Sequence, residues 1–402
     1  MNDFLSKEEC FKLINKYGSP LYVYDEETLR IRSREMMNLL PNKNLIVDYS
    51  IKANTNIELL KIIKSEGLHV DAMSLGEIAF EKKVGYSSNE IMYVCNNISE
   101  SEMKEVINSG ILISVDSLSQ LEMYGKLNPN GDIVVRFNPG IGDGHHEKVI
   151  TGGKKTKFGV QREFINDVKE ILNKYNLNLV GINQHIGSLF LDYTKYIEGI
   201  KNILEIAECF KDLKLIDLGG GFGVPYNYEE RLDLNKLSNE LDKVLSSFLD
   251  SYDNKDVKFY IEPGRYVVAE CGVLLGSVTS IKDNYNTKYL GCDIGFNVLS
   301  RPILYDSYHE IKVLQRNEDK NKETYTVVGN ICESGDILGK DRLLSKASVN
   351  DLLIVYTAGA YGYSMASNYN LRSRPAEVLI TKDHKDILIR RRDTIEDMLS
   401  NF

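Results

Sequence analysis

The sequence predicts an α/β plus all-β protein: an N-terminal (β/α)8 barrel of the TIM type, followed by a C-terminal β domain of the β-sandwich or Greek-key kind. Three observations support this. From about residue 44 to residue 262, short apolar and β-branched runs alternate with helical patterns, which is typical of parallel sheets with right-handed crossovers. Eight such runs fit a closed barrel better than an open sheet. After Arg265 the helical periodicity largely disappears, and strand-like runs are joined by polar turns.

The barrel elements are predicted from periodicity, since alternating or continuous apolar runs indicate strands and a 3.6-residue period indicates helices. The candidate strands are residues 44–51, 68–72, 91–94, 111–115, 132–138, 179–186, 213–218 and 257–262. The helical patterns between them span residues 57–65, 75–83, 100–108, 163–173, 196–210 and 234–249.

The remaining candidate strands lie outside the barrel. In the C-terminal part they are residues 267–281, 288–294, 325–328, 352–357, 376–380 and 387–391, with a short helix near 394–399. The early run PLYVYD (20–25) is also strand-like, and we expect it to pair with the β domain. The predicted domains are an N-terminal segment 1–30, a barrel 31–265 and a β domain 266–402.

Composition excludes several classes of protein. The chain has 49 Lys and Arg against 58 Asp and Glu, a net charge of −9, which disfavours nucleic acid as a general partner. It shows neither a basic, apolar leader nor a run of about 18 apolar residues, so we expect no signal peptide and no membrane span. The six cysteines are scattered without a CxxC pair, which favours reduced thiols in a cytoplasmic enzyme.

Polar residues follow several of the predicted barrel strands. In a (β/α)8 barrel the loops after the strands meet at one mouth, where the chemistry lies. Lys52, His185, the glycine cluster 219–223, and Glu262 with Arg265 would all face this mouth.

Lys52 and the glycines have two interpretations each. A lysine at a dry barrel mouth can form imines with aldehydes, but a lysine just past a strand can also be a surface residue. Glycines let backbone N–H groups approach a phosphate, but they also form tight structural turns. The spacing is neither GxGxxG nor a Walker loop. A lysine together with a phosphate cradle favours pyridoxal phosphate over a nucleotide.

Glu262 and His185 fit the same cofactor. A carboxylate beside the pyridine nitrogen keeps it protonated, which makes the ring an electron sink; alternatively Glu262 pairs with Arg265 or ends a strand. His185 could stack on the ring or be a core histidine whose hydrogen bonds are satisfied.

No metal site is predicted, because His145 and His146 are predicted to lie in a loop and no zinc-ligand spacing occurs. The sequence contains no GxSxG motif, which disfavours acyl-transfer chemistry.

At this point the chain resembles the pyridoxal-phosphate-dependent decarboxylases of the alanine-racemase-like fold (fold type III) and, within them, the meso-diaminopimelate decarboxylases. Each matching string is modest alone, but nine in the right order are specific. They are GSPLYVYD (18–25), YSIKAN (49–54), TGGKKTKFG (151–159), HIGS (185–188), LGGGFGVPY (218–226), IEPGR (261–265), GFNVLSRPILYDSYH (295–309), ICESGD (331–336) and GAYGYSMASNYN (359–370). Gly329-Asn330 and Ser74-Leu75-Gly76 depart from the family pattern, which concerns only loop geometry.

The resemblance implies residue roles. Lys52 would bind the cofactor covalently, Glu262 would face its pyridine nitrogen and His185 its ring, and Cys332 would donate a proton after CO2 leaves. The implied cofactor-binding set is Lys52, Asp71, His185, Ser188, Gly219, Gly220, Gly221, Glu262, Pro263, Gly264, Arg265 and Tyr361. The implied substrate-binding set is Arg265, Arg301, Tyr305, Glu333 and Tyr361, with arginine chosen for bidentate carboxylate binding. By themselves, Cys332 is also compatible with a buried apolar role and Arg301 with a surface charge at a strand end.

The resemblance also implies an activity and a partner. The activity is decarboxylation of meso-2,6-diaminopimelate to L-lysine, the last step of lysine biosynthesis. The partner is a second copy of the chain, since Cys332 and Glu333 would come from the other subunit of a homodimer. Alternatives are a decarboxylase of ornithine, lysine, arginine or a secondary-metabolism substrate, and a non-catalytic pyridoxal-phosphate-binding homologue. The β domain and the presence of both Lys52 and Cys332 disfavour the latter.

Overall fold

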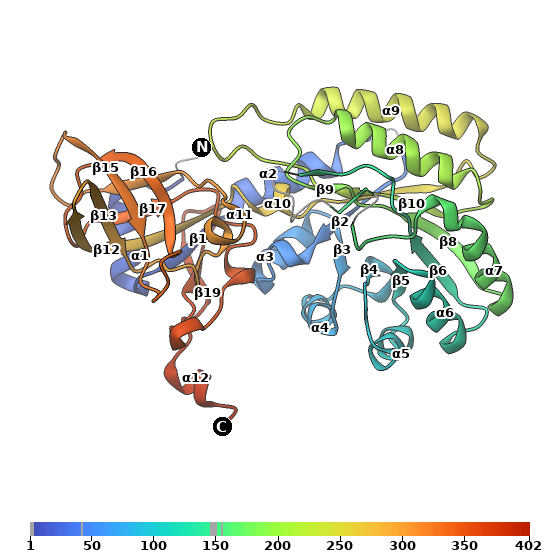
Figure 1. The fold of residues 1–402 in the computed structure, drawn as a ribbon, viewed down its shortest axis with the longest axis horizontal. Helices are drawn as coiled ribbons and strands as arrows, with labels where there is room; N and C mark the ends of the chain where they lie inside the picture. Colours follow the sequence, from blue (N-terminus) through green and yellow to red (C-terminus); the bar gives the residue numbers. More distant parts are fainter. Residues whose placement is uncertain (1–3, 42, 145–150, 154–155) are drawn as a thin grey trace. The chain divides into compact units, whose positions relative to one another are not determined.

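The structure is a computed structural model that describes residues 4–41, 43–144, 151–153 and 156–402 (Figure 1). The chain divides into two compact units. The barrel unit comprises Arg32–Val224 and Glu230–Val267, and the β unit comprises Met1–Ile31, Pro225–Glu229 and Val268–Phe402.

Eight parallel strands of the barrel unit close on themselves in the order β10-β11-β2-β3-β4-β5-β6-β8, which confirms the predicted barrel. Each forms where the sequence has a short buried apolar run. The strands are β2 (Leu45–Ser50), β3 (His69–Ala72), β4 (Ile91–Val94), β5 (Leu112–Val115), β6 (Asp132–Arg136), β8 (Asn178–Asn183), β10 (Leu215–Gly220) and β11 (Lys258–Glu262). The two-residue strands β7 (Asp143–Gly144) and β9 (Gly187–Ser188) pair separately.

Helices follow the barrel strands, and α8 and α9 lie side by side in Figure 1. Helix α2 (Glu26–Met37) precedes the first barrel strand, and the helices that follow barrel strands are α3 (Ile57–Ser65), α4 (Leu75–Val84), α5 (Glu100–Asn108), α6 (Leu118–Leu127), α7 (Ile165–Tyr175), α8 (Thr194–Ala207), α9 (Leu234–Ser251) and α10 (Arg265–Val268). Serine side chains cap α4, α5 and α6 by accepting a first-turn N–H. The sequence pattern did not predict α6, in which Gly125 interrupts the period. A Cβ there would lie 2.4 Å from the Tyr175 ring of α7.

The β unit contains a nine-stranded mixed sheet. Its strands are β1 (Leu21–Asp25), β12 (Gly272–Asn284), β13 (Thr287–Cys292), β14 (Ile311–Leu314), β15 (Lys322–Val328), β16 (Ile337–Ser345), β17 (Leu352–Val355), β18 (Ala376–Ile380) and β19 (Asp386–Arg390). Strand β1 lies between β12, to which it is antiparallel, and β18, to which it is parallel. Helix α1 (Lys7–Tyr17) packs Cys10, Leu13 and Ile14 onto this sheet, and α11 (Arg301–Tyr305) and α12 (Ile395–Leu399) complete the unit.

Two expectations for the β unit are corrected. The predicted strand 267–281 is wrong at its start, since residues 265–268 form α10 and β12 begins at Gly272. Strands β14 and β16 were not predicted, because polar residues such as Lys312, Lys340 and Arg342 break their apolar pattern. Among the described residues, no helix combines the length and apolar character that crossing a bilayer requires.

Helix α4 buries a carboxyl group that gives a testable prediction. Glu81 is fully buried, and neither of its oxygens has a hydrogen-bond partner within the described residues. Burial raises its pKa to about 9, with Asp71 and Glu77 adding to the effect. The folded state therefore holds a proton that the unfolded state releases, so this residue makes stability fall as pH rises from about 5 toward 9.

We expect Glu81→Gln to raise the free energy of unfolding at pH 8 by about 1–2 kcal/mol, because the amide carries no charge to bury. Urea denaturation of both proteins at pH 6 and pH 8 measures the effect. A gain of equal size at both pH values would contradict the assignment.

Candidate active site

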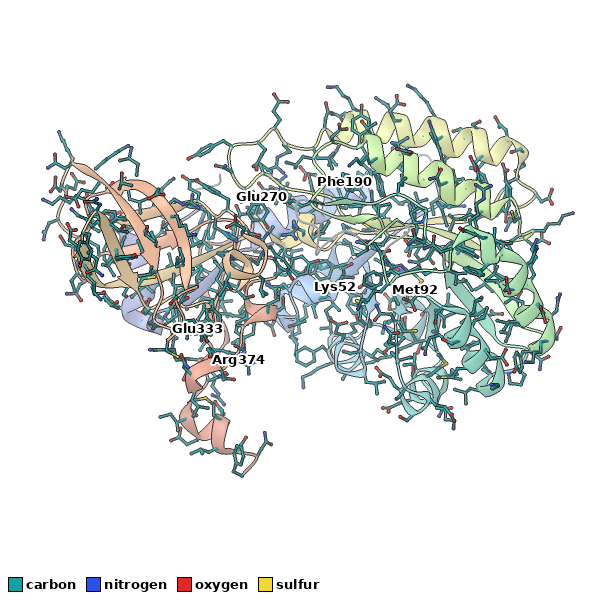
Figure 2. The ribbon with its side chains drawn as sticks, in the orientation of Figure 1. Lys52, Met92, Phe190, Glu270, Glu333 and Arg374 are labelled. Atoms are coloured by element: carbon teal, nitrogen blue, oxygen red, sulfur yellow. The ribbon has the colours of Figure 1, made fainter. Side chains whose placement is uncertain are left out.

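Lys52 lies in the 3-10 turn η1 (Ile51–Ala53), directly after β2 at the carboxyl end of the barrel (Figure 2). Its side chain is half-buried, and Nζ lies 3.5 Å from Sδ of Met73, which follows β3. The ammonium group lies in the electrostatic field of Asp71 and Glu262, whose pKa values it helps to lower. The structure therefore places Lys52 at the barrel mouth beside carboxylates, rather than on an open surface.

Asp71 is the next-to-last residue of β3 and interacts electrostatically with this lysine. It is 1% exposed, and its Oδ2 accepts a 2.6 Å hydrogen bond from the Ser50 hydroxyl on β2. Burial raises the pKa of Asp71 to about 7, Glu262 adds to the rise, and Lys52 and the Ser50 bond oppose it. Its Oδ1 is buried without a hydrogen-bond partner among the described residues.

Glu262 ends β11 and is 4% exposed. Its Oε2 lies 3.5 Å from Nδ1 of His185, which follows β8. Burial acts to raise the pKa of Glu262, but the bond with His185 and the charges of Lys52 and Arg136 hold it below its usual value. Burial lowers the pKa of His185 and the adjacent Glu262 carboxylate opposes this effect, while Nδ1 also lies 3.1 Å from the backbone nitrogen of Gly220. Glu262 is thus an ionised carboxylate in a buried position.

Asp217 on β10 was not predicted as a site residue. It is fully buried, accepts the N–H of Gly219 at Oδ1 (2.8 Å) and an amide N–H of Asn183 at Oδ2 (3.3 Å), and is hydrogen-bonded to Glu262. Burial and the adjacent Glu262 charge raise the pKa of Asp217 well above its usual value. The opposite pKa shifts of the two groups favour a proton on Asp217 and a charge on Glu262.

This protonation state predicts an unusual mutational pattern. Asp217→Asn supplies an N–H in place of the O–H, so we expect activity within about threefold of the native protein, whereas Asp217→Ala loses about 10- to 100-fold. The pH–rate profiles of both variants check the assignment, because loss of the donor shifts the acidic limb set by Glu262. Equal losses in the two variants would show that Asp217 acts as an anion.

The glycine cluster forms the end of β10 and the turn after it. Gly219 has φ +75°, and a Cβ there would lie 2.3 Å from the carbonyl oxygen of Gln184. A Cβ at Gly220 would lie 1.9 Å from the carbonyl oxygen of Glu262. The N–H groups of Gly219 and Gly220 are engaged by Asp217 and His185, so these two glycines allow close strand approach. Gly221, with φ +108°, follows them at the mouth.

The segment after β11 also lies at this mouth. Arg265 is 6% exposed, and its Nη2 donates a 3.1 Å bond to the Ser188 hydroxyl. The carbonyl of Pro263 accepts the N–H of Ser50 at 3.3 Å, and a Cβ on Gly264 would lie 3.0 Å from the Ser50 Cβ. These contacts fix Arg265 beside the loop that carries Ser188.

Arg136, at the end of β6, is a second residue that received no role from the sequence. It is 6% exposed, and its guanidinium lies 4.8 Å from the centroid of the Phe158 ring. Burial lowers its pKa, and Glu262, Asp116, Asp217 and Asp71 oppose this effect. The Arg136 guanidinium is therefore a cation close to several acidic side chains in the barrel interior. The signal in the sequence was an arginine ending a predicted strand.

In the β unit, Arg301 begins α11 and is 1% exposed, so its interpretation as a surface charge at a strand end is wrong. Its Nη1 lies 2.8 Å from His309 Nε2, its Nη2 donates to Ser307 at 3.4 Å, and its guanidinium lies 4.5 Å from the Tyr226 ring centroid. Tyr305, half-buried, ends the same helix. These neighbours orient the guanidinium.

Cys332 and Glu333 are exposed on the β unit, so Cys332 is not a buried apolar residue. The Cys332 Sγ accepts a 3.2 Å bond from the Asn370 amide, whose oxygen accepts the Cys332 N–H. The Glu333 carboxylate accepts a 2.7 Å bond from Tyr369. Tyr361 adopts a left-handed conformation (φ +54°) and is half-buried.

Among the described residues, no group of three or more His, Cys, Asp or Glu side chains could hold a metal ion. His145 and His146, predicted as loop, and Lys154 and Lys155 of the TGGKKTKFG string lie outside the described residues.

Comparison with known proteins gives consistent matches. Residues 26–269 match the family model described as "Pyridoxal-dependent decarboxylase, pyridoxal binding domain". A diaminopimelate decarboxylase of Methanothermobacter thermautotrophicus is 38% identical over 97% of this chain and 93% of its own length. The crystal structure of diaminopimelate decarboxylase from M. jannaschii with L-lysine has TM-score 0.89 and 32% identity, covering 98% and 94% of the two chains. The corresponding Helicobacter pylori structure with L-lysine has TM-score 0.90 and 29% identity, covering 97% and 98%.

Proposed function

Because the chain belongs to the family of pyridoxal-dependent decarboxylases, which use pyridoxal 5'-phosphate, we propose that it converts meso-2,6-diaminopimelate to L-lysine and CO2. The observation that carries this proposal is the buried, ionised Glu262 at the same barrel mouth as Lys52. A carboxylate that binds the cofactor's pyridine nitrogen keeps it protonated, which favours loss of CO2 from the substrate Cα.

The residues at the mouth fit the cofactor. Glu262 Oε1 and Asp71 Oδ1 are buried acceptors without a partner among the described residues, and a bound group with N–H or O–H donors would satisfy them. Lys52 supplies the amine, and Arg265 with Ser188 supplies a cation and a hydroxyl for a phosphate. We assign the cofactor to these residues with His185, Gly219, Gly220, Gly221, Pro263, Gly264 and Tyr361.

When bound, pyridoxal phosphate supplies an aldehyde that condenses with amines and a ring that accepts the electron pair left by CO2. The residues of the chain bind and position the cofactor and the substrate. Lys52 would hold the cofactor through its amine, and the substrate would bind at the same place through its own amine. Protonated Asp217 donates a hydrogen bond to Glu262 and holds that carboxylate in place, while neutral His185 covers the site without adding a charge.

We assign Arg265, Arg301 and Tyr305 to the distal carboxylate of the substrate, Glu333 to its distal ammonium, and Tyr361 to the same substrate-binding set. Arg301 supports this because its planar guanidinium is buried and oriented by His309, Ser307 and Tyr226. A guanidinium fixed in this way can pair with a carboxylate in two parallel bonds.

We propose that the protein works as a homodimer in which Cys332 and Glu333 complete the site of the partner subunit. Their exposure in a single chain, with the Cys332 thiol held by Asn370, supports a role across an interface. The Cys332 thiol would give a proton to the substrate Cα after CO2 leaves. We also propose the domain limits 1–30, 31–265 and 266–402.

The test is CO2 release from meso-diaminopimelate, ornithine, lysine and arginine, measured side by side. We expect release from meso-diaminopimelate alone, with L-lysine as product. Arg301→Lys should lower kcat/KM for meso-diaminopimelate about 10- to 100-fold, because an ammonium cannot form the bidentate pair. Arg316→Lys, at an exposed arginine of the same unit, is the matched control. Comparable turnover of ornithine would contradict the substrate assignment.

A further inference from the structure

A cavity lies in the barrel unit, at the amino ends of the strands, opposite the end that carries Lys52. Its volume is about 420 Å³, within the range of small-molecule sites. Residues at or next to the starts of strands line it, among them His69 of β3, Met92 of β4 and Leu215 of β10. Exposed residues form its rim, including Asn89 and Gly110, so it opens to solvent.

The inner end of this cavity carries an acidic side chain. Asp48 on β2 lines the cavity, is 1% exposed, and has no hydrogen-bond partner on either carboxyl oxygen among the described residues. It lies two residues before Ser50, which bonds Asp71 at the other end of the barrel, so both side chains point to the barrel interior. A buried carboxyl group without a partner is costly, and a ligand that supplied one would recover that cost.

The walls between Asp48 and the rim are apolar. Met92, Val180 and Leu215 belong to one hydrophobic cluster, against which the half-buried Leu112 and Tyr260 pack. Met92 is marked in Figure 2. These walls suit an aliphatic chain that runs from the rim to Asp48.

The carboxyl groups around Asp48 bear on whether the cavity favours a cationic or an anionic ligand. Burial raises the pKa of Asp48 well above its usual value, and Asp217 on β10, Asp71 on β3, Glu262 on β11 and Glu81 on α4 add to the rise. An ammonium group placed on Asp48 would favour the ionised form of this carboxyl group and form a charge-assisted hydrogen bond with it, which an anion cannot do.

We propose that this cavity binds an aliphatic primary amine, with its ammonium group on Asp48 and its chain along Met92, Val180 and Leu215. The rim carries both Asp132 and Lys214, so the outer end of the ligand can be either a plain amine or an amino acid. This site is separate from the proposed active site and does not depend on its substrate.

Equilibrium dialysis of the holoenzyme with labelled cadaverine tests the proposal. Amines also react at the cofactor, and the visible absorbance reports that site alone. We expect two bound molecules per chain in the native protein and one in Asp48→Asn, with the absorbance titration unchanged. Asp250→Asn, an exposed carboxylate on α9, is the control and should retain both sites.

Further probes separate the possible ligands. We expect n-pentylamine to bind at least tenfold more tightly than 1-pentanol, which has the same chain without the charge. A single bound molecule per chain, a second molecule retained by Asp48→Asn, or equal binding of pentanol and pentylamine would overturn the proposal. The last comparison uses the native protein and counts only the binding that leaves the visible absorbance unchanged, so it reports on the Asp48 cavity even where a variant fails to fold.

Discussion

Replacing Lys52 with alanine is expected to remove the visible absorbance of the bound cofactor and to lower CO2 release on the order of 10³-fold or more. Its amine is the only nucleophile we assign at the barrel mouth, and it is held there by the turn that follows β2. Loss of the amine leaves Asp71 and Glu262 in place, so the site should still bind the cofactor's phosphate and ring, but without a covalent bond.

Two further variants make the Lys52 experiment specific. Lys52→Arg keeps a cation near Asp71 and Glu262 but lacks a nucleophilic amine, so it should be as inactive as Lys52→Ala. Lys61→Ala, on the exposed face of α3, should behave as the native protein. An absorbance that survives in Lys52→Ala would mean that another amine holds the cofactor.

The barrel could be predicted from the sequence because its strands are buried on both sides. Runs such as Ile91–Val94 and Leu112–Val115 are short, apolar and bounded by polar helices, which leaves few alternatives. The position of Lys52 and Glu262 at one mouth then follows from topology alone, because all parallel strands end at the same side.

The polar interior of the barrel could not be predicted in the same way. Asp217 and Asp48 lie inside strands, where the sequence shows single acidic residues in apolar runs but not which face they occupy. Their importance comes from neighbours on other strands, such as Asn183 and Glu262, which only the closed barrel brings together. The role of Tyr226 beside Arg301 was hidden for the same reason, since more than seventy positions of chain separate them.

Replacing the exposed Cys332 is expected to have the second large effect on activity. We expect Cys332→Ala to lower the rate of L-lysine formation about 10²- to 10⁴-fold, the range that a positioned proton donor contributes. Bound cofactor should keep its absorbance, because Cys332 is not among the residues that hold it. Cys209→Ala removes the other exposed cysteine and should have no effect on the rate.

Mixing the two inactive variants tests the shared site. If Cys332 acts in the partner's site, a dimer of one Lys52→Ala chain and one Cys332→Ala chain has one site with both residues and one with neither. Random exchange makes half of the dimers mixed, so activity should recover to about a quarter of the native value. Recovery requires chain exchange, which a mixture refolded together provides and a mixture of intact dimers at high concentration does not. A refolded mixture as inactive as its parents would place Cys332 in the site of its own chain, since no pairing could then unite the two native residues.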